Sequence, residues 1–159
     1  MKEVLFQPIG KRVEVKTEER VLDAILVQAL DVLMACGGKG MCATCHVWVD
    51  AGMDQLTPIT EREQRTLMRV SGANEKSRLS CQAKILGDGV VVSLPDGFYI
   101  ESTKDLESLI GKRAKDNILH PIDGRILVEK SKIITRSRIM ELKDVDVDMA
   151  RVKAEAAKL

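Results

Sequence analysis

Aromatic residues are scarce in this chain of 159 residues, in which Phe, Trp and Tyr together make up 3%. So few flat rings argue against a stacking platform for single-stranded nucleic acid, and no nucleic-acid partner is expected. No apolar run approaches the length needed to cross a bilayer, so no membrane span is expected. Residues 1–8 also lack the apolar segment of a secretory signal. We therefore expect a soluble protein of the cytoplasm.

Net charge is nearly absent as well. The chain has 25 Lys and Arg against 24 Asp and Glu, a net charge of +1. Residues 1–99 carry 12 basic and 13 acidic side chains, and residues 100–159 carry 13 and 11, so the two parts have net charges of −1 and +2. A chain with so small a net charge does not attract charged partners over long distances by its electrostatic field. Partner binding should depend on local complementarity.

The cysteines, in contrast, are concentrated. Cys36, Cys42 and Cys45 lie within ten residues, and Cys81 follows after a gap of 35 residues. Thiolates are soft, anionic ligands, and four of them suit the iron of an iron–sulfur cluster or a closed zinc site. The spacing therefore indicates a metal centre.

The residues between these cysteines support that interpretation. Gly37, Gly38 and Gly40 permit φ values that other residues avoid, so the backbone can wrap closely around an inorganic core with its N–H groups turned inward. Such N–H groups would hydrogen-bond the sulfurs and help to set the reduction potential. The Thr44 hydroxyl could donate to a sulfur or stabilise the turn by bonding to backbone.

Three other interpretations of the cysteines compete with an iron–sulfur cluster. A disulfide framework is compatible with the even count, but clustered cysteines in a reducing compartment more often bind metal. Structural zinc usually takes two short Cys-x-x-Cys pairs, whereas Cys81 stands alone. Residues 42–46 match the c-type haem pattern Cys-x-x-Cys-His, which leaves Cys36 and Cys81 unexplained. Only the iron–sulfur interpretation uses every cysteine.

The pattern Cys-x5-Cys-x2-Cys with a distant Cys81 resembles the 2Fe–2S ferredoxins. The five-residue spacing, His46 directly after Cys45, and the sequence Arg-Leu-Ser-Cys-Gln at 78–82 are similar to the adrenodoxin-type branch. The resemblance covers residues 1–98. It implies an α+β fold, a β-grasp domain with a mixed sheet and a packed helix. It also implies that one 2Fe–2S cluster is bound by Cys36, Cys42, Cys45 and Cys81.

Local patterns predict the elements of this first domain. Strands are expected at 4–6, 12–16 and 46–50, and an amphipathic helix at 17–30 with Thr17 as its N-cap. Thr60 and Glu63 fit a capping box that begins a second helix, which Gly72 would end. Residues 78–86 and 90–94 read as a closing pair of strands joined by a hairpin turn at 87–89.

Two features near the ligands have competing explanations. His46 could donate a hydrogen bond that makes the potential depend on pH, but a histidine bonded to backbone that only orders the loop is favoured. The helix after Thr60 corresponds to the acidic docking helix of adrenodoxin-type proteins. Here its charged residues are mixed and give a net charge of +1: Glu61, Arg62, Glu63, Arg65 and Arg69. This departure argues against the usual basic partners and favours a solvated face.

Residues 99–159 form a C-terminal extension that a minimal ferredoxin lacks. Its patterns predict a short helix capped by Thr103, small strands around an Asp123-Gly124 turn, and one or two final helices. Positive charge gathers at 112–138 and negative charge at 141–148. We expect this extension to be a docking module, or a module that forms a homodimer.

The expected function is one-electron transfer between a reductase or other donor and a redox enzyme. No side-chain pair resembles a nucleophile with its base, so no enzyme and no catalytic residue is expected. A second hypothesis comes from the C-terminal extension and from the lack of a strong negative net charge that could attract basic redox partners. In it the chain is a redox-sensing interaction or assembly protein, stabilised by its cluster and acting through residues 99–159.

Overall fold

The computed structural model describes residues 1–28 and 33–159. Its larger sheet has the strand order β2-β1-β5-β3-β4. The strands are β1 (Lys2–Gln7), β2 (Lys11–Val15), β3 (His46–Ala51), β4 (Ser77–Leu79) and β5 (Val90–Ser93). β1 pairs antiparallel with β2 and parallel with β5, so the sheet is mixed. Helix α1 (Val21–Leu26) contributes to the same hydrophobic core, which confirms the α+β class and the packed helix.

The alternation that predicted the strands also determines which side chains are buried. Val13 and Val15 of β2 and Val47 and Val49 of β3 all point into the core, and each is less than a tenth exposed. α1 adds Val21, Ala24 and Ile25 to this core. The predicted strands at 4–6, 12–16 and 46–50 are therefore confirmed to within a few residues.

Helix α1 begins later than predicted. Its N-cap is Arg20 and not Thr17, because residues 18–20 first run alongside a distant segment. Glu18 N–H donates to the Ile85 carbonyl at 2.7 Å, and Ile85 N–H donates to the Glu19 carbonyl at 2.9 Å. These long-range bonds prevent a helical start at Thr17. The far end of the predicted helix, at Ala29 and Leu30, lies outside the described residues.

The predicted hairpin of 78–86 with 90–94 is wrong. β4 ends at Leu79 and pairs with β3, while β5 pairs with β1 and with β3. After β4 the chain turns, with Gln82 N–H donating to the Leu79 carbonyl at 2.9 Å. Residues 87–89 are therefore a connection between non-adjacent strands, and Cys81 lies in the turn after β4 rather than on a strand.

The C-terminal extension, together with Phe98, builds a second, smaller sheet with the order β6-β7-β8. Its elements are β6 (Phe98–Tyr99), the 3-10 helix η3 (Thr103–Leu109), β7 (Ile118–Leu119), β8 (Ile126–Val128), α3 (Arg136–Glu141) and α4 (Asp144–Ala156). The short strands and the final helices match the prediction. The N-cap of η3 is Ser102 rather than Thr103, because Asp105 completes a capping box with Ser102.

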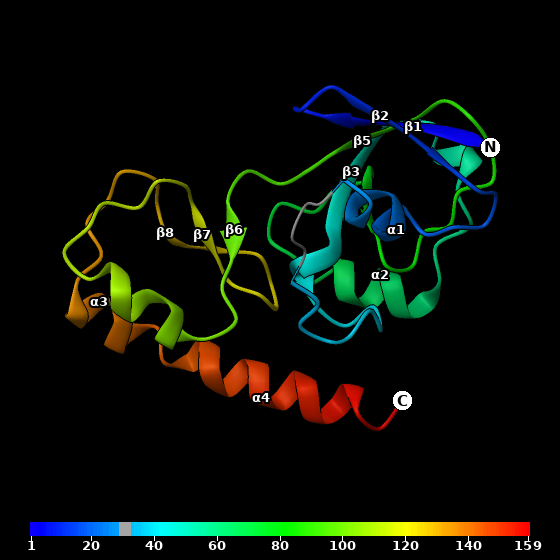
Figure 1. Ribbon diagram of the computed structural model, residues 1–159. Helices are drawn as coiled ribbons and strands as arrows, with labels where there is room; N and C mark the ends of the chain where they lie inside the picture. The colour runs from blue at the N-terminus through cyan, green and yellow to red at the C-terminus, as the bar shows by residue number, and fades with distance from the viewer. Residues whose placement is uncertain (29–32) are drawn as a thin grey trace.

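Helix α4 runs from the smaller sheet to the part of the chain that holds the first three cysteines (Figure 1). We call residues 36–45 the cysteine loop. On α4, Met149, Val152 and Ala156 are buried in one cluster with Ala35, Cys36 and Cys42. Lys39 also donates from Nζ to the carbonyl oxygens of Ala156 and Leu159, at 3.2 and 3.1 Å. The extension therefore packs back onto its own chain and covers one side of the cysteine loop.

This packing can be tested with two valines of the same helix. Val152 is 5% exposed against the cysteine loop, whereas Val147 is 68% exposed. We expect Val152→Thr to destabilise the docked helix by about 1–3 kcal/mol, because a buried hydroxyl without a partner replaces a methyl group. Val147→Thr should change stability by less than about 0.5 kcal/mol. Hydrogen exchange of α4 amides measures both effects, and equal values for the two variants would contradict the packing.

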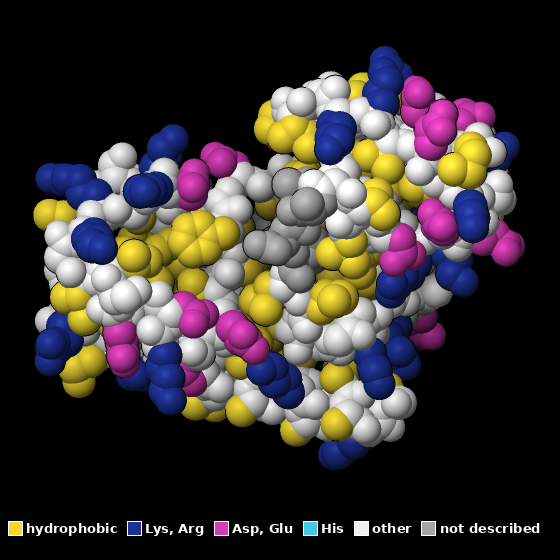
Figure 2. Space-filling view, viewed as in Figure 1, with side chains coloured by type: hydrophobic (Ala, Val, Ile, Leu, Met, Phe, Trp, Pro, Cys, Tyr) yellow, Lys and Arg dark blue, Asp and Glu magenta, His cyan; other side chains and the backbone are white. Residues whose placement is uncertain are grey.

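Charges of both signs are interspersed on the face shown in Figure 2, with hydrophobic patches between them. This agrees with the small net charge of the sequence. Within residues 1–28 and 33–159, no helix combines the length and the apolar character needed to cross a membrane.

Candidate metal centre

The cysteine loop depends on glycines with left-handed backbone. Gly37, Gly38 and Gly40 have φ values of +71°, +79° and +75°, a region that strains other residues. A Cβ atom on Gly40 would also stand 3.0 Å from the side chain of Gln82. The predicted need for glycine is therefore confirmed, and at Gly40 close packing adds to the backbone requirement.

All four cysteines are buried, and they pack as two pairs. Cys42 Sγ lies 3.5 Å from Cys36 Sγ. Cys45 and Cys81 lie together in a second buried cluster with Leu22 and Leu79. The η1 turn (Ala43–Cys45) and the start of β3 hold Cys45, and the turn after β4 presents Cys81 to it. The fold thus brings together cysteines that are 36 or more positions apart in the sequence.

Backbone N–H groups stabilise negative charge on these sulfurs. Met41 N–H donates to Cys36 Sγ at 3.4 Å. The Cys42 thiol, with the N–H groups of Met41, Lys39 and Gly38, lowers the pKa of Cys36 to about 5. The Cys45 thiol and the Gln82 amide likewise lower the pKa of Cys81 to about 7. Donation to these thiolates, together with burial, raises the pKa of Cys42 and of Cys45. Each pair therefore contains one cysteine, Cys36 or Cys81, whose lowered pKa favours the anionic thiolate that binds metal.

Thr44 has both of the bonds considered from the sequence. Its Oγ1 accepts the Ala35 N–H at 3.4 Å and lies 2.9 Å from Cys42 Sγ. Because the Cys42 thiol donates its proton to Cys36, the Thr44 hydroxyl donates to the sulfur of Cys42. Thr44 therefore connects the two ends of the cysteine loop and adds a donor to one sulfur.

A buried ion pair supports the site from beneath, and the sequence analysis missed it. Glu63 on α2 (Glu61–Leu67) is fully buried and accepts from Arg78 Nε at 2.7 Å and from Leu79 N–H at 2.9 Å. Only half of the predicted capping box forms. Thr60 accepts the Glu63 N–H at 3.2 Å, while the Glu63 carboxylate turns toward Arg78. A further bond from the Thr66 hydroxyl to the Gly40 carbonyl, at 2.6 Å, ties α2 to the cysteine loop.

Two other side chains, to which the sequence analysis gave no role, lie at the cysteine loop. Gln82 donates from Nε2 to the Gly38 carbonyl at 3.1 Å and to Cys81 Sγ at 3.5 Å. Arg20 holds Asp23 through Nε and Nη2, while its Nη1 lies 3.5 Å from where a Cβ of Gly38 would stand. Only their proximity in the sequence to a ligand or a helix start distinguished these residues.

His46 has a side-chain partner instead of the expected backbone bond. Its Nε2 lies 2.8 Å from Ser77 Oγ, and its ring meets Trp48 edge-on with centroids 4.5 Å apart. Burial lowers the pKa of His46 to about 4. Cys45, His46 and Tyr99 also line a cavity of about 360 Å³, most of whose other lining residues are apolar. His46 is thus a neutral residue that connects β3 to Ser77.

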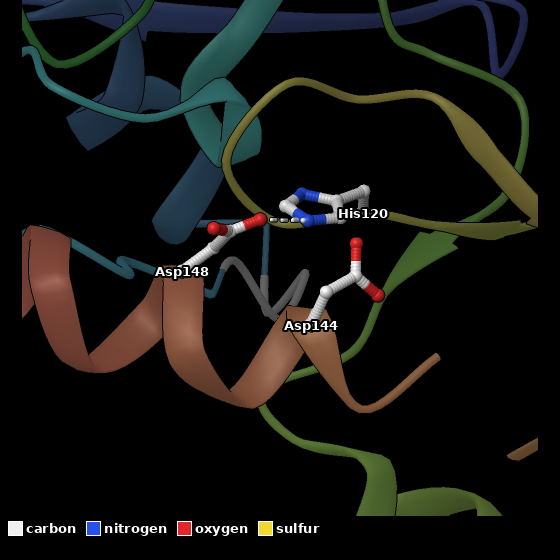
Figure 3. Close-up of side chains that lie close together, drawn as sticks. All are labelled: His120, Asp144 and Asp148. Atoms are coloured by element: carbon white, nitrogen blue, oxygen red, sulfur yellow. Dashed lines mark hydrogen bonds and ion pairs between the residues drawn. The ribbon is translucent and has the colours of Figure 1, made fainter. Parts of the chain in front are cut away.

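His120, Asp144 and Asp148 also lie close together, in a second cluster outside the cysteine loop (Figure 3). His120 Nδ1 accepts the Ile122 N–H at 3.0 Å, so the ring proton is on Nε2, which faces Asp148 Oδ2 at 3.1 Å. Asp144 in turn binds Arg125 Nη2 at 2.8 Å. The bonds of His120 to Asp148 and of Arg125 to Asp144 therefore hold α4 against the turn at 120–125.

Comparison with known proteins agrees with this geometry. Residues 4–86, just over half of the chain, match the family of 2Fe-2S iron-sulfur cluster binding domains. The chain belongs to the 2Fe-2S ferredoxin family. Rhodocoxin of Rhodococcus erythropolis is 44% identical to this ferredoxin over 89 residues, which cover 53% of this chain and 83% of rhodocoxin.

Two solved structures are similar. The ISC-like 2Fe-2S ferredoxin of Pseudomonas putida aligns with a TM-score of 0.57 and 32% identity, over 60% of this chain and 93% of that one. Putidaredoxin, in its covalent complex with putidaredoxin reductase, aligns with a TM-score of 0.50 and 32% identity, over 59% of this chain and 98% of that one. The β-grasp fold and the 2Fe–2S cofactor are those of the family. The C-terminal extension lies beyond the family match, which ends at residue 86.

Proposed function

We propose that this ferredoxin is a one-electron carrier in which Cys36, Cys42, Cys45 and Cys81 bind the 2Fe–2S cluster. The observation that carries the proposal is the packing of four buried cysteines as two pairs, Cys36 with Cys42 and Cys45 with Cys81. Four thiolates are the ligand set that such a cluster takes. The bound cluster accepts and returns a single electron.

The residues around the sulfurs fit that group. Gly38, Lys39 and Met41 direct backbone N–H groups at Cys36, and Gly40 directs one at Cys81. Donors of this kind stabilise added negative charge and so raise the potential at which an electron is accepted. At Gly37 no atom lies within 4 Å of where a Cβ would stand, so glycine is needed there only for its left-handed backbone, with φ of +71°. Thr44 adds its hydroxyl to Cys42.

The partners that suit this carrier are other redox proteins. Putidaredoxin, a similar structure, forms a complex with its reductase. We infer that a reductase donates the electron to this ferredoxin and that a redox enzyme accepts it. The protein is thus a carrier rather than an enzyme. Because its four cysteines must stay reduced to bind the cluster, a reducing compartment such as the cytoplasm suits it.

We also propose that the two parts expected on either side of residue 98 have separate roles. We propose that residues 1–98 hold the cluster and that residues 99–159 cover part of the cysteine loop through α4. The apolar contacts of Met149, Val152 and Ala156 with the cysteine loop support this covering role. The homodimer expected through residues 99–159 stays a prediction.

The proposal is tested by spectroscopy and by turnover. Anaerobically purified protein should contain two irons per chain, and reduction with dithionite should produce one low-temperature electron paramagnetic resonance signal of a 2Fe–2S centre. A ferredoxin reductase should then pass electrons through the protein to cytochrome c. Iron-free protein would overturn the proposal. An intact cluster that no reductase reduces, with stoichiometric capture of a partner through residues 99–159, would favour the redox-sensing role.

A further inference from the structure

One side of the cysteine loop is closed by the protein itself. α4 buries Cys36 and Cys42 beneath Met149 and Val152, and Lys39 binds the carbonyl oxygens at the end of that helix. α2 supports the loop from another side through the bond of Thr66 to Gly40. A protein partner that approaches the sulfurs along either direction would have to displace a packed helix.

The opposite edge of the loop remains accessible. We call Arg20, Gly37, Gly38, Gln82 and Lys84 the open rim. Gly37 and Lys84 are exposed, and the Arg20 side chain is 37% exposed. Gln82, which touches both Cys81 Sγ and the Gly38 carbonyl, is only half-buried. At the open rim a single side chain therefore separates a sulfur from solvent.

The open rim also has two positively charged side chains, those of Arg20 and Lys84. Arg20 and Lys84 face each other in an antiparallel bridge, which places their side chains on the same face. Asp23 binds Nε and Nη2 of Arg20, while Nη1 has no hydrogen-bond partner within the described residues and lies over Gly38. Besides the hydrogen bond to Asp23, attraction to the sulfur of Cys81 raises the pKa of Arg20. The guanidinium is thus held over the cysteine loop, with one nitrogen that no described residue binds.

We propose that electrons enter and leave this ferredoxin through the open rim, and that its redox partner presents a carboxylate-rich surface there. The inference rests on the proposed electron-carrier function. Arg20 Nη1 and Lys84 Nζ would each pair with a partner carboxylate, the interaction that a guanidinium and an ammonium favour at an interface. The resulting orientation would bring the partner against Gly38 and Gln82, next to Cys81.

Small oxidants of opposite charge test this assignment without a known partner. In each reaction one electron passes from the reduced protein either to ferricyanide, which becomes ferrocyanide, or to hexaamminecobalt(III), which becomes cobalt(II). At low ionic strength, Lys84→Gln should slow oxidation by the trianion about fivefold and speed oxidation by the trication by a similar factor. At high salt both effects should fall below about twofold, because the charges are then screened.

Matched variants separate a local field from net charge and from misfolding. Arg12→Gln removes one positive charge from an exposed ion pair between Arg12 on β2 and Glu3 on β1, and it should leave both rates within about 1.5-fold. Arg20→Lys should retain more of the ferricyanide rate than Arg20→Gln does. Because Lys84 takes no part in capping α1, its variant keeps the proposal testable if Arg20 variants fold poorly.

Binding provides a readout that does not depend on electron transfer. Hexacyanocobaltate(III) has the charge of ferricyanide but accepts no electron, and we expect it to shift the amide resonances of Lys84 and its neighbours, less so in Lys84→Gln. Equal responses of Lys84→Gln and Arg12→Gln, in rates and in binding, would overturn the proposal. A normal cluster spectrum in those same samples would show that the electron-carrier function itself still stands.

Discussion

The Cys81→Ala variant should lose the visible absorption of the cluster altogether. Cys81 is the only one of the four cysteines that lies outside the cysteine loop, and it packs with Cys45 in one buried cluster. Without its sulfur, three thiolates remain for two irons that need four protein ligands. Anaerobic purification followed by iron analysis and absorption spectroscopy measures the loss, and a retained spectrum would refute the ligand assignment.

The neighbouring residue provides a control of matched position and burial. Ser80 is 1% exposed, and its hydroxyl has no hydrogen-bond partner in the described part of the chain. Ser80→Ala removes that buried, unsatisfied hydroxyl and should leave both the iron content and the spectrum unchanged. If Ser80→Ala also lost the cluster, the effect of Cys81→Ala would report disturbance of the turn rather than loss of a ligand.

Features that depend on residues a few positions apart were predictable from the sequence. The glycines of the cysteine loop have the positive φ values that their spacing indicated, and Thr60 caps α2 as expected. The alternation of Val47 and Val49 located β3 and its buried face. In each case the physical cause, a backbone preference, a cap or a period of two, is local and therefore visible in the sequence.

The errors arose where a distant segment decides the local structure. α1 begins at Val21 because residues 18–20 bond to Ile85, and residues 87–89 join no hairpin because β5 finds its partners in β1 and β3. A turn-forming sequence such as Gly-Asp-Gly reverses the chain but does not choose which strands pair. Burial of α4 against the cysteine loop is equally non-local, since its apolar face alone does not identify what it covers.

The buried ion pair belongs to this non-local class. Glu63 was interpreted as a capping residue at the helix surface, yet its side chain is fully buried and that of Arg78 is only 4% exposed. Glu63 also accepts the Leu79 N–H, so one carboxylate connects α2 to the strand that leads to Cys81. A local pattern cannot separate these roles, because Glu at that position satisfies a cap or a distant arginine equally well.

Replacement of Glu63 by alanine should therefore destabilise the protein by about 3–5 kcal/mol. Removing one partner leaves the Arg78 guanidinium buried without its counter-ion, which costs far more than losing an exposed pair. Leu79 N–H would lose its acceptor at the same time, and the turn that presents Cys81 should loosen. The anaerobic urea midpoint of the loaded protein measures the destabilisation, and the rate of iron release to a chelator reports on the turn.

Glu61→Ala on the same helix separates this effect from helix propensity and from general loss of charge. Glu61 is also paired with an arginine, Arg65, but its side chain is 79% exposed. Water already solvates both of these charges, so the substitution should cost less than about 1 kcal/mol and leave iron release unchanged. Equal losses from Glu63→Ala and Glu61→Ala would mean that the carboxylate beneath the cysteine loop does not stabilise the site. A large loss confined to Glu63→Ala would show that a buried charge pair maintains the geometry of the turn holding Cys81.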